Sequence, residues 1–595
     1  MSQLGIFDRA SIFAPKASSL YRSFLSSLSS WRDNKTIADY RAVPYDWRLR
    51  LDDILQTVNK DGRVMYQGAT TYKDSYIYET LKDLVETSYS GSVTIVTHSN
   101  GGLLAKIFLD AMARNNDPLL DNVDNLILVG VPQVGTPSSV VSMLHGDSVG
   151  PRGWVVSQEM SRTLLNTMPF GHHLLPHEQY FDEQNITIDT SVIRFEPGTT
   201  TDPWREQFGQ ELTDQSSLRA FLYADGERAT PEDGDLASPA VLEDSLVRYA
   251  NVIQTIVGNW QPPHTMQVYQ VAGTGLLTPA RITYFNKEVC EQRQLLMPWR
   301  CADYGDALGY RVEHARDGDG TVLAPSAVAM SESSQVERWW INLFEYNDGN
   351  TNRSHKNLLE IPEMSTFLLS TINRTSTAYQ YLTKEQPVLA DSGRLVFQLH
   401  SPLDMQVVDT SGNRVSSSTE DIVGGMYRRY GELQYISVPK TDEFKVILTG
   451  ESTGSFTLEL EEWLDEDRVE RVSFSAIPSS TSTVVTVMVG DGLSDVVLDM
   501  DYTGGGEVVL EILQTGEVRE LILKTDNETD ASTEASGRSP QSNPVTRASI
   551  VNADVAGVAV DGVSDAEQHD YYQELFRLLN ELKVLLEIFE NNYVY

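Results

Sequence analysis

Hydrophobic positions in the first two thirds of the chain alternate between short apolar runs and stretches with helical spacing. Apolar runs rich in β-forming residues occupy 93–97, 126–131 and 266–272. Between the first two, residues 101–115 carry Leu103, Leu104, Ile107, Phe108 and Met112 at helical spacing. Strands that alternate with helices predict an α/β fold with a mainly parallel sheet covered by helices on both faces.

The predicted α/β domain covers residues 1–384, with an irregular insertion at about 135–265. The insertion is too long for a simple loop. It is either a cap over a site or a peripheral subdomain. Its aromatic residues include Trp154, Phe170, Trp204, Phe208 and Trp260.

Beyond residue 385 the pattern changes to short alternating segments separated by Gly, Asp and Ser. This spacing predicts an antiparallel β-sandwich over 385–525. We assign it no chemistry, because its one histidine, His400, has no nucleophile motif beside it. Its role is either that of a spacer or stabilising module or that of a ligand-binding module.

The last two segments differ sharply in composition. Residues 526–562 are mostly small and polar and predict a flexible linker. Residues 563–595 predict a helix that either docks onto the chain or mediates self-association. Its seam is Leu575, Leu579, Leu582, Leu586 and Phe589.

Charge and cysteine content narrow the function classes. The formal net charge of −38 disfavours nucleic-acid binding and contact with anionic bilayers. No apolar run reaches 18 residues, and residues 1–30 do not resemble a signal peptide. Cys290 and Cys301 form either one loop disulfide or two free thiols. No metal-binding pattern surrounds them, and we expect neither a metal nor a cofactor.

The strongest chemical signal is the run at residues 93–102, where an apolar strand meets His-Ser-Asn-Gly-Gly and then a helix. A nucleophile elbow needs this arrangement, with Ser99 exposed on a strained turn. Thr97 replaces the first glycine of the usual Gly-x-Ser-x-Gly pattern. We expect the His98 side chain to point away from the site.

A serine nucleophile needs a base and an orienting carboxylate, which follow it in the chain order Ser, Asp, His in this fold. Asp319 in the turn 317–322 is the preferred acid, with Asp317 second, and His355 is the base. The alternatives are a surface turn or partial calcium loop for the aspartates and a solvated loop for His355.

The insertion also contains a group of three histidines at positions 172, 173 and 177. No carboxylate or cysteine spacing accompanies them, so a structural or lid role is favoured over metal binding.

Several stretches together resemble the lecithin:cholesterol acyltransferase family of α/β-hydrolases. The resemblance spans about residues 5–375 and includes the Ser99 motif and Ser354-His355. Its other motifs lie at 44–48 (Pro-Tyr-Asp-Trp-Arg), 128–137, 168–176, 268–279 and 318–322 (Gly-Asp-Gly-Thr-Val).

The resemblance implies an acyl-enzyme mechanism on a lipid ester. Ser99 would be the nucleophile, His355 the base, Asp319 the orienting acid, and the backbone N–H of Asn100 an oxyanion donor. Transfer to water would make the protein a lipase or phospholipase, and transfer to an alcohol an acyltransferase. The cap would make transient contact with a lipid surface. Asp46 and Arg48 are interpreted as a structural ion pair.

One feature departs from the family. No strand ending in a Pro-Gly-rich loop, the source of the second oxyanion donor, is recognisable in residues 1–30. We therefore expect the chain to lack that first strand and a signal peptide that preceded it, and the protein to be extracellular or on the cell surface. The alternatives are a serine esterase on non-lipid substrates and a degenerate hydrolase domain in a surface adhesion or binding protein.

Overall fold

The computed structural model describes residues 21–521, apart from short internal gaps. The gaps are 61–62, 66–67, 70, 148–156, 183–190, 224–227, 229, 233, 349–351, 390–392, 401, 442, 466, 491, 507–508 and 515–517. By its contacts the chain forms one compact unit that ends at Lys524. The predicted linker and C-terminal helix therefore lie outside the described residues, as do residues 1–20, and the boundary at 384/385 stays a prediction.

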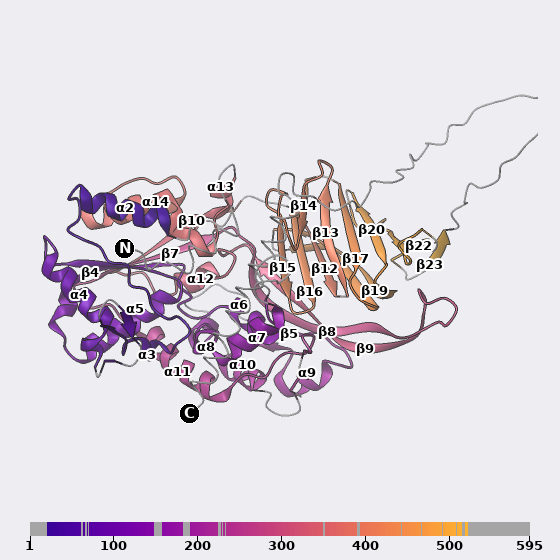
Figure 1. Cartoon of the computed structure of the whole chain (residues 1–595), viewed down its shortest axis with the longest axis horizontal. Coiled ribbons are helices and arrows are strands. Elements are labelled where there is room, and N and C mark those ends of the chain that lie inside the picture. The colour runs from indigo at the N-terminus through magenta and orange to yellow at the C-terminus, as the bar shows by residue number, and fades with distance from the viewer. Residues whose placement is uncertain are drawn as a thin grey trace, which may run out of the picture. The chain divides into compact units, whose positions relative to one another are not determined.

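A five-stranded sheet forms the centre of the α/β part, in the order β11-β10-β7-β4-β3 (Figure 1). The pairs β3–β4, β4–β7 and β7–β10 are parallel, and β11 is antiparallel to β10. The strands are β3 (Val93–His98), β4 (Val123–Val129), β7 (Gln267–Thr274), β10 (Val336–Asn342) and β11 (Leu382–Thr383).

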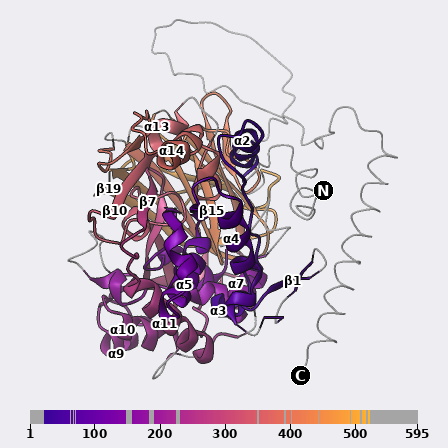
Figure 2. The ribbon, with the colours of Figure 1, turned by 90° about the vertical axis from the view of Figure 1, so that its left-hand side faces the viewer.

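Strand β4 shows why the sheet is covered on both faces. Leu126 and Leu128 face one hydrophobic cluster, while Ile127 and Val129 face another, because side chains alternate along a strand. The first cluster is closed by α3 (Leu51–Ile54), α4 (Tyr76–Thr87), α5 (Asn100–Arg114) and α11 (Asp244–Asn259). The second is closed by α2 (Arg22–Asp33), α13 (Leu343–Asn347), the 3₁₀ segment η5 (His355–Glu360) and α14 (Pro362–Asn373). Figure 2 shows α2 and α14 at one end of the molecule and α3 and α11 at the other.

The insertion after β4 is mainly helical. It contains α6 (Pro137–His145), α7 (Gln158–Thr167), α8 (Pro169–His173), η4 (Glu178–Phe181), α9 (Asp202–Phe208), α10 (Gln215–Leu222) and the short strands β5 (Ile193–Phe195) and β6 (Glu211–Leu212). The α/β part also contains β1 (Val58–Lys60), β2 (Arg63–Met65), η1 (Tyr72–Asp74), η2 (Pro118–Asn122) and α12 (Ala324–Ala327).

A long β-hairpin follows β7, which the sequence patterns did not predict. Its strands β8 (Thr278–Arg293) and β9 (Cys301–Ala315) pair along almost their whole length and join β5 and β6 in a four-stranded sheet. A disulfide between Cys290 and Cys301 closes the turn end of the hairpin. Figure 1 shows the hairpin leaving the α/β part and running along the C-terminal sheets.

Two antiparallel sheets follow residue 392 and share one hydrophobic core. One has the order β15-β16-β12-β18-β19 and the other β14-β13-β17-β20-β21-β22-β23. Their strands are β12 (Gly393–His400), β13 (Leu403–Asp409), β14 (Arg414–Ser416), β15 (Met426–Tyr430), β16 (Leu433–Pro439), β17 (Phe444–Gly450), β18 (Gly454–Leu464), β19 (Asp467–Ser479), β20 (Val484–Val489), β21 (Leu498–Asp501), β22 (Val509–Ile512) and β23 (Val518–Leu521).

Buried ion pairs join the hairpin to these sheets. Arg311 of β9 is 4% exposed and donates from Nε to Glu459 of β18 at 2.8 Å and from Nη1 to Glu196 at 2.8 Å. Arg471 of β19 also bonds Glu459. The α/β part and the C-terminal sheets are therefore fixed to each other through buried charges as well as apolar contact.

Within the described residues, no helix is both long enough and apolar enough to cross a bilayer.

Candidate active site

Ser99 occupies the sharp turn between β3 and α5. Its backbone has φ +54° and ψ −132°, an unusual conformation for a residue with a side chain. The Ser99 N–H donates to the Val129 carbonyl of β4 at 3.0 Å, which anchors the turn to the sheet. The serine therefore stands at the carboxyl edge of the parallel strands.

The residues around the turn account for the departure from the usual glycine pattern. The Thr97 hydroxyl donates to the Ile127 carbonyl of β4 at 3.2 Å, so a threonine side chain is accommodated. A Cβ at Gly102 would lie 2.3 Å from Val131, and this close approach requires glycine. At Gly101 a Cβ would make only ordinary contacts, the nearest at 3.6 Å with the Tyr45 hydroxyl.

His355, at the start of η5, lies between Ser99 and Asp319. Its Nε2 is 2.9 Å from Ser99 Oγ, and its Nδ1 is 2.8 Å from Asp319 Oδ2. The His355 N–H also donates to the Asp319 carbonyl at 2.8 Å. The three residues come from segments up to 256 positions apart and form one chain of hydrogen bonds.

Asp319 is 1% exposed, and both of its oxygens have hydrogen-bond donors. Oδ1 accepts from the backbone N–H groups of Thr321 at 3.1 Å and Val322 at 2.8 Å, and Oδ2 accepts from His355. Asp317 instead accepts from Thr274 and Gln386 through Oδ1. The structure thus brings Asp319 to His355.

Glycines at two strand ends make room for this pair. A Cβ at Gly130, after β4, would lie 3.2 Å from Asp319 Oδ2 and 3.3 Å from His355 Nδ1. A Cβ at Gly273, in β7, would lie 2.8 Å from the Asp319 Cβ. A larger residue at Gly273 would push Asp319 out of position. Gly130 and Gly273 therefore both make room for the His355–Asp319 pair, a role that the sequence patterns did not reveal.

His98 does not point away from the site, and that expectation was wrong. Its Nε2 is 2.7 Å from the His355 carbonyl, and its Nδ1 is 2.9 Å from the Tyr21 hydroxyl. A carbonyl only accepts, so Nε2 carries the proton and Nδ1 accepts from Tyr21. Burial, and then the nearby His355, lower the pKa of His98 to about 3, so this ring stays neutral.

Helix α2 supports the histidine segment from another direction. The Glu360 carboxylate of η5 accepts from the Ser23 N–H at 2.9 Å and from the Ser23 hydroxyl at 2.6 Å, at the first turn of α2. A carboxylate is favourable at a helix N-terminus. Neither Tyr21 nor Glu360 belongs to a motif, so no sequence signal identified them.

Asn100 is the first residue of α5, where backbone N–H groups have no acceptor within the helix. Beside this turn lies Tyr45 of the Pro-Tyr-Asp-Trp-Arg motif, and burial raises the pKa of its hydroxyl to about 12. In the same motif, Arg48 and Asp46 form an exposed ion pair at 2.7 Å.

The three histidines of the insertion are buried. His172 Nδ1 and His177 Nε2 each bond a backbone carbonyl, and burial lowers the pKa of His177 to about 4. Among the residues that the structure describes, no group of three or more His, Cys, Asp or Glu could hold a metal ion.

A buried lysine lies on the same helix as the Asn100 turn. Lys106 of α5 is 2% exposed and donates to Gln133 Oε1 at 2.7 Å. Burial lowers the pKa of Lys106 to about 7. Gln133 in turn bonds Gln270 of β7, so the lysine belongs to a polar network under the insertion.

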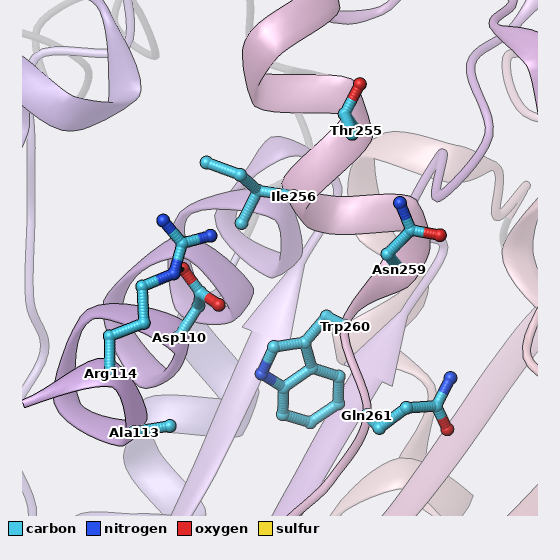
Figure 3. Close-up of a pocket in the computed structure, with 8 residues that line it drawn as sticks. All are labelled: Asp110, Ala113, Arg114, Thr255, Ile256, Asn259, Trp260 and Gln261. Carbon is cyan, nitrogen blue, oxygen red and sulfur yellow. Dashed lines mark ion pairs between the residues drawn. The ribbon is translucent and has the colours of Figure 1, made fainter. Parts of the chain in front are cut away.

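A cavity of about 240 Å³ opens between the ends of α5 and α11 (Figure 3). Trp260 lines it beside the ion pair of Arg114 and Asp110. Because α5 rises about 1.5 Å per residue, this cavity lies roughly 20 Å along the helix from Ser99. It is therefore separate from the Ser99 site.

A parallel sheet covered by helices, with a serine on the strand-to-helix turn and a His–Asp pair behind it, defines the α/β-hydrolase class. The family model described as "Lecithin:cholesterol acyltransferase" matches residues 5–360, which is more than half of the chain. The chain belongs to this family.

A curated relative from Arabidopsis thaliana, "Lecithin-cholesterol acyltransferase-like 4", is 23% identical over 298 residues. The match covers 45% of this chain and 50% of the relative, so the chain spans about half the length of the relative it matches.

Two solved structures also resemble the chain, each at 12% identity. The Tle4–Tli4 complex has a TM-score of 0.29 and covers 51% of this chain and 64% of the matched chain. The Bacillus licheniformis lipase BlEst2 in its propeptide form has a TM-score of 0.23 and covers 74% and 84%. Both scores lie below 0.5, so the function of neither protein transfers to this chain.

Proposed function

We propose that this protein is a serine hydrolase or acyltransferase that acts on lipid esters through an acyl-enzyme on Ser99. One observation carries the proposal: His355 is within hydrogen-bond distance of both Ser99 Oγ, at 2.9 Å, and Asp319 Oδ2, at 2.8 Å. Membership of the lecithin:cholesterol acyltransferase family supports a lipid ester as the substrate.

In the first half-reaction, Ser99 Oγ bonds to the ester carbonyl carbon while His355 Nε2 takes the hydroxyl proton. Asp319 accepts from Nδ1–H and stabilises the imidazolium that forms. The carbonyl oxygen becomes an oxyanion that accepts from the Asn100 N–H. The bond to the leaving alcohol then breaks, and the alcohol takes the proton from His355.

The second half-reaction repeats these steps with a different nucleophile. His355 takes a proton from water or from an acceptor alcohol, whose oxygen attacks the acyl-Ser99 carbonyl. Ser99 leaves with its proton restored. Water gives a fatty acid, as in a lipase or phospholipase, and an alcohol gives a new ester, as in an acyltransferase.

A fluorophosphonate probe tests the nucleophile. We expect labelling of wild type at Ser99 and none of Ser99→Ala, with Ser142→Ala as a labelled control. Absence of labelling in folded wild type would favour the alternative of a surface adhesion or binding protein with a degenerate hydrolase domain.

A substrate panel tests the ester class. We expect faster turnover of phosphatidylcholine and triacylglycerol emulsions than of a soluble short-chain ester, and a long-chain alcohol in the assay separates transfer from hydrolysis. A preference for the soluble ester would favour a non-lipid esterase instead.

We further propose that the protein is extracellular or on the cell surface and that its cap makes transient contact with lipid. The Cys290–Cys301 disulfide supports an oxidising compartment. Trp47, whose exposed fraction is 43%, packs its ring against Phe170 of α8 and supports an apolar cap surface. Intact-mass measurement of the native protein without reductant tests the disulfide.

A further inference from the structure

The turn of the β8–β9 hairpin exposes two adjacent leucines. Leu295 is 96% exposed and Leu296 is 87% exposed. Isolated exposed leucines are common, but a fully exposed adjacent pair at the end of a long projection indicates a contact surface. We call residues 294–300 the hairpin tip.

The hairpin tip stands on a rigid base. The Cys290–Cys301 disulfide ties its two strands, and backbone bonds close the turn from Gln294 N–H to Arg300 O at 3.0 Å and from Arg300 N–H to Met297 O at 2.8 Å. The leucines are therefore presented on an ordered turn.

Arg293 and Trp299 fasten this base to the C-terminal sheets. Arg293 donates to the Tyr502 hydroxyl at 3.0 Å and to the Ser479 carbonyl at 2.9 Å. The Trp299 ring packs against the core of those sheets, 6.1 Å from the Tyr502 ring. Beyond these contacts Leu295 and Leu296 have no cover, and Figure 1 shows the turn at the far end of the hairpin.

The charge of the tip is opposite to that of the chain. The hairpin tip contains Arg300 and no carboxylate, whereas the whole chain carries a net charge of −38. The nearest acidic residues in sequence are Glu291, which lies inside the disulfide-closed loop next to Cys290, and Asp303, which lies outside it.

We propose that the hairpin tip docks the protein on an electrically neutral, zwitterionic phospholipid surface. The leucines would enter the region beneath the headgroups, and Arg300 beside them would face the lipid phosphates. A neutral surface fits better than an anionic one, because the net charge of the chain opposes approach to an anionic bilayer.

The size of the tip favours lipid over a second protein. A specific protein interface covers about 800 Å² on each partner, far more than two leucines offer. Shallow insertion into lipid requires only a small apolar tip on a rigid support.

The test is co-sedimentation of the full chain with phosphatidylcholine vesicles, carried out with Ser99→Ala so that no lipid is hydrolysed. Burying a leucine is worth about 1.5–3 kcal/mol, and each 1.4 kcal/mol is tenfold. We expect Leu295→Ser/Leu296→Ser to weaken binding by about tenfold or more. The control Val388→Ser/Val423→Ser, which alters valines that are 94% and 81% exposed, should bind like its parent.

Lipid charge and salt sharpen the test. Adding anionic phosphatidylglycerol to the vesicles should weaken binding at low salt. Added salt should restore binding, because it screens the repulsion between the acidic chain and the anionic lipid. A dye on Leu296→Cys should shift to the blue on neutral vesicles and give no shift without them.

Three results would each overturn the proposal. They are no binding of the parent to neutral vesicles, equal binding by the double leucine variant, and a leucine variant that differs from its parent only in oligomeric state. The last would identify a self-association surface. Vesicle binding is measured on the Ser99→Ala variant, so its outcome does not depend on whether Ser99 reacts with the fluorophosphonate probe. Failure of the docking proposal can therefore be told apart from failure of the proposed function.

Discussion

The Ser99 site and the junction between the hairpin and the C-terminal sheets both bury ionisable side chains from distant segments, yet they balance charge differently. At the junction Arg311 is a permanent cation held between Glu196 and Glu459. At the site the Asp319 carboxylate faces two backbone N–H groups and an imidazole. Charge at the junction is fixed, whereas the imidazole can gain and lose a proton. The first arrangement suits a structural joint and the second suits proton transfer.

The largest expected effect comes from the acid of the site. Loss of the orienting aspartate in a serine triad lowers kcat about 10⁴-fold, and we expect a loss of that order for Asp319→Asn because an amide disturbs the tautomer of His355. Asp317→Asn is the matched control and should retain most activity, since its contacts are with Thr274 and Gln386. Turnover per fluorophosphonate-labelled active site, measured for both variants, shows which aspartate is needed. Equal losses in the two variants would contradict the assignment of Asp319.

A substitution at the junction should lower the free energy of unfolding. Removing one partner of a buried ion pair costs about 3–5 kcal/mol, and we expect Arg311→Met to fall at the lower end because Glu459 keeps Arg471. Urea unfolding measures this change. The control Arg248→Met removes an exposed, solvent-screened pair with Asp244 and should leave the urea midpoint close to that of wild type. A slower Ser99 labelling rate in the folded Arg311 variant would show that the junction also tunes the site.

Lys106 provides a test by pH, because it is a buried amine whose hydrogen bonds go to Gln133 Oε1 and the Val257 carbonyl, neither of which is a carboxylate. Burial lowers the pKa of Lys106 to about 7 in the folded protein, below the ordinary lysine value of 10.5. The unfolded chain therefore binds the extra proton between these values, and stability rises with pH across that window. The destabilisation is fully present below pH 7.

We accordingly expect Lys106→Met to stabilise the protein relative to wild type at pH 6, and the gain to shrink between pH 7 and 10.5. Urea unfolding at several pH values measures it. A difference that stays constant with pH would mean that Lys106 titrates normally in the folded state.

The smallest effect concerns His98, which acts through His355 as a positioning residue. An unsatisfied buried carbonyl costs about 1–3 kcal/mol, so His98→Phe should slow Ser99 labelling by roughly tenfold. His98→Gln keeps an N–H donor and should recover most of the rate, and Tyr21→Phe should cost least. The pH profile of labelling separates this role from a merely structural one. Variants that unfold more easily but label at the wild-type rate when folded would refute positioning.

The sequence by itself determined the local chemistry of this protein. The run at 93–102 specifies a strand, a turn and a helix through residues close to one another, and the period of apolar positions specifies the α/β order and the later switch to short strands. The family motifs in the sequence indicated the resemblance to the lecithin:cholesterol acyltransferase family, and the match of the family model to residues 5–360 confirms it.

Only the tertiary structure decided which distant groups meet. The sequence favoured Asp319 over Asp317 but left both as candidates, and in the structure the turn held by Thr321 and Val322 directs Asp319 to His355. The direction of His98, the bond between Cys290 and Cys301, and the pairing of Arg311 depend in the same way on strand register and packing. Contacts between segments far apart in the chain are set by how sheets and helices pack, and local patterns of residues carry little information about that packing.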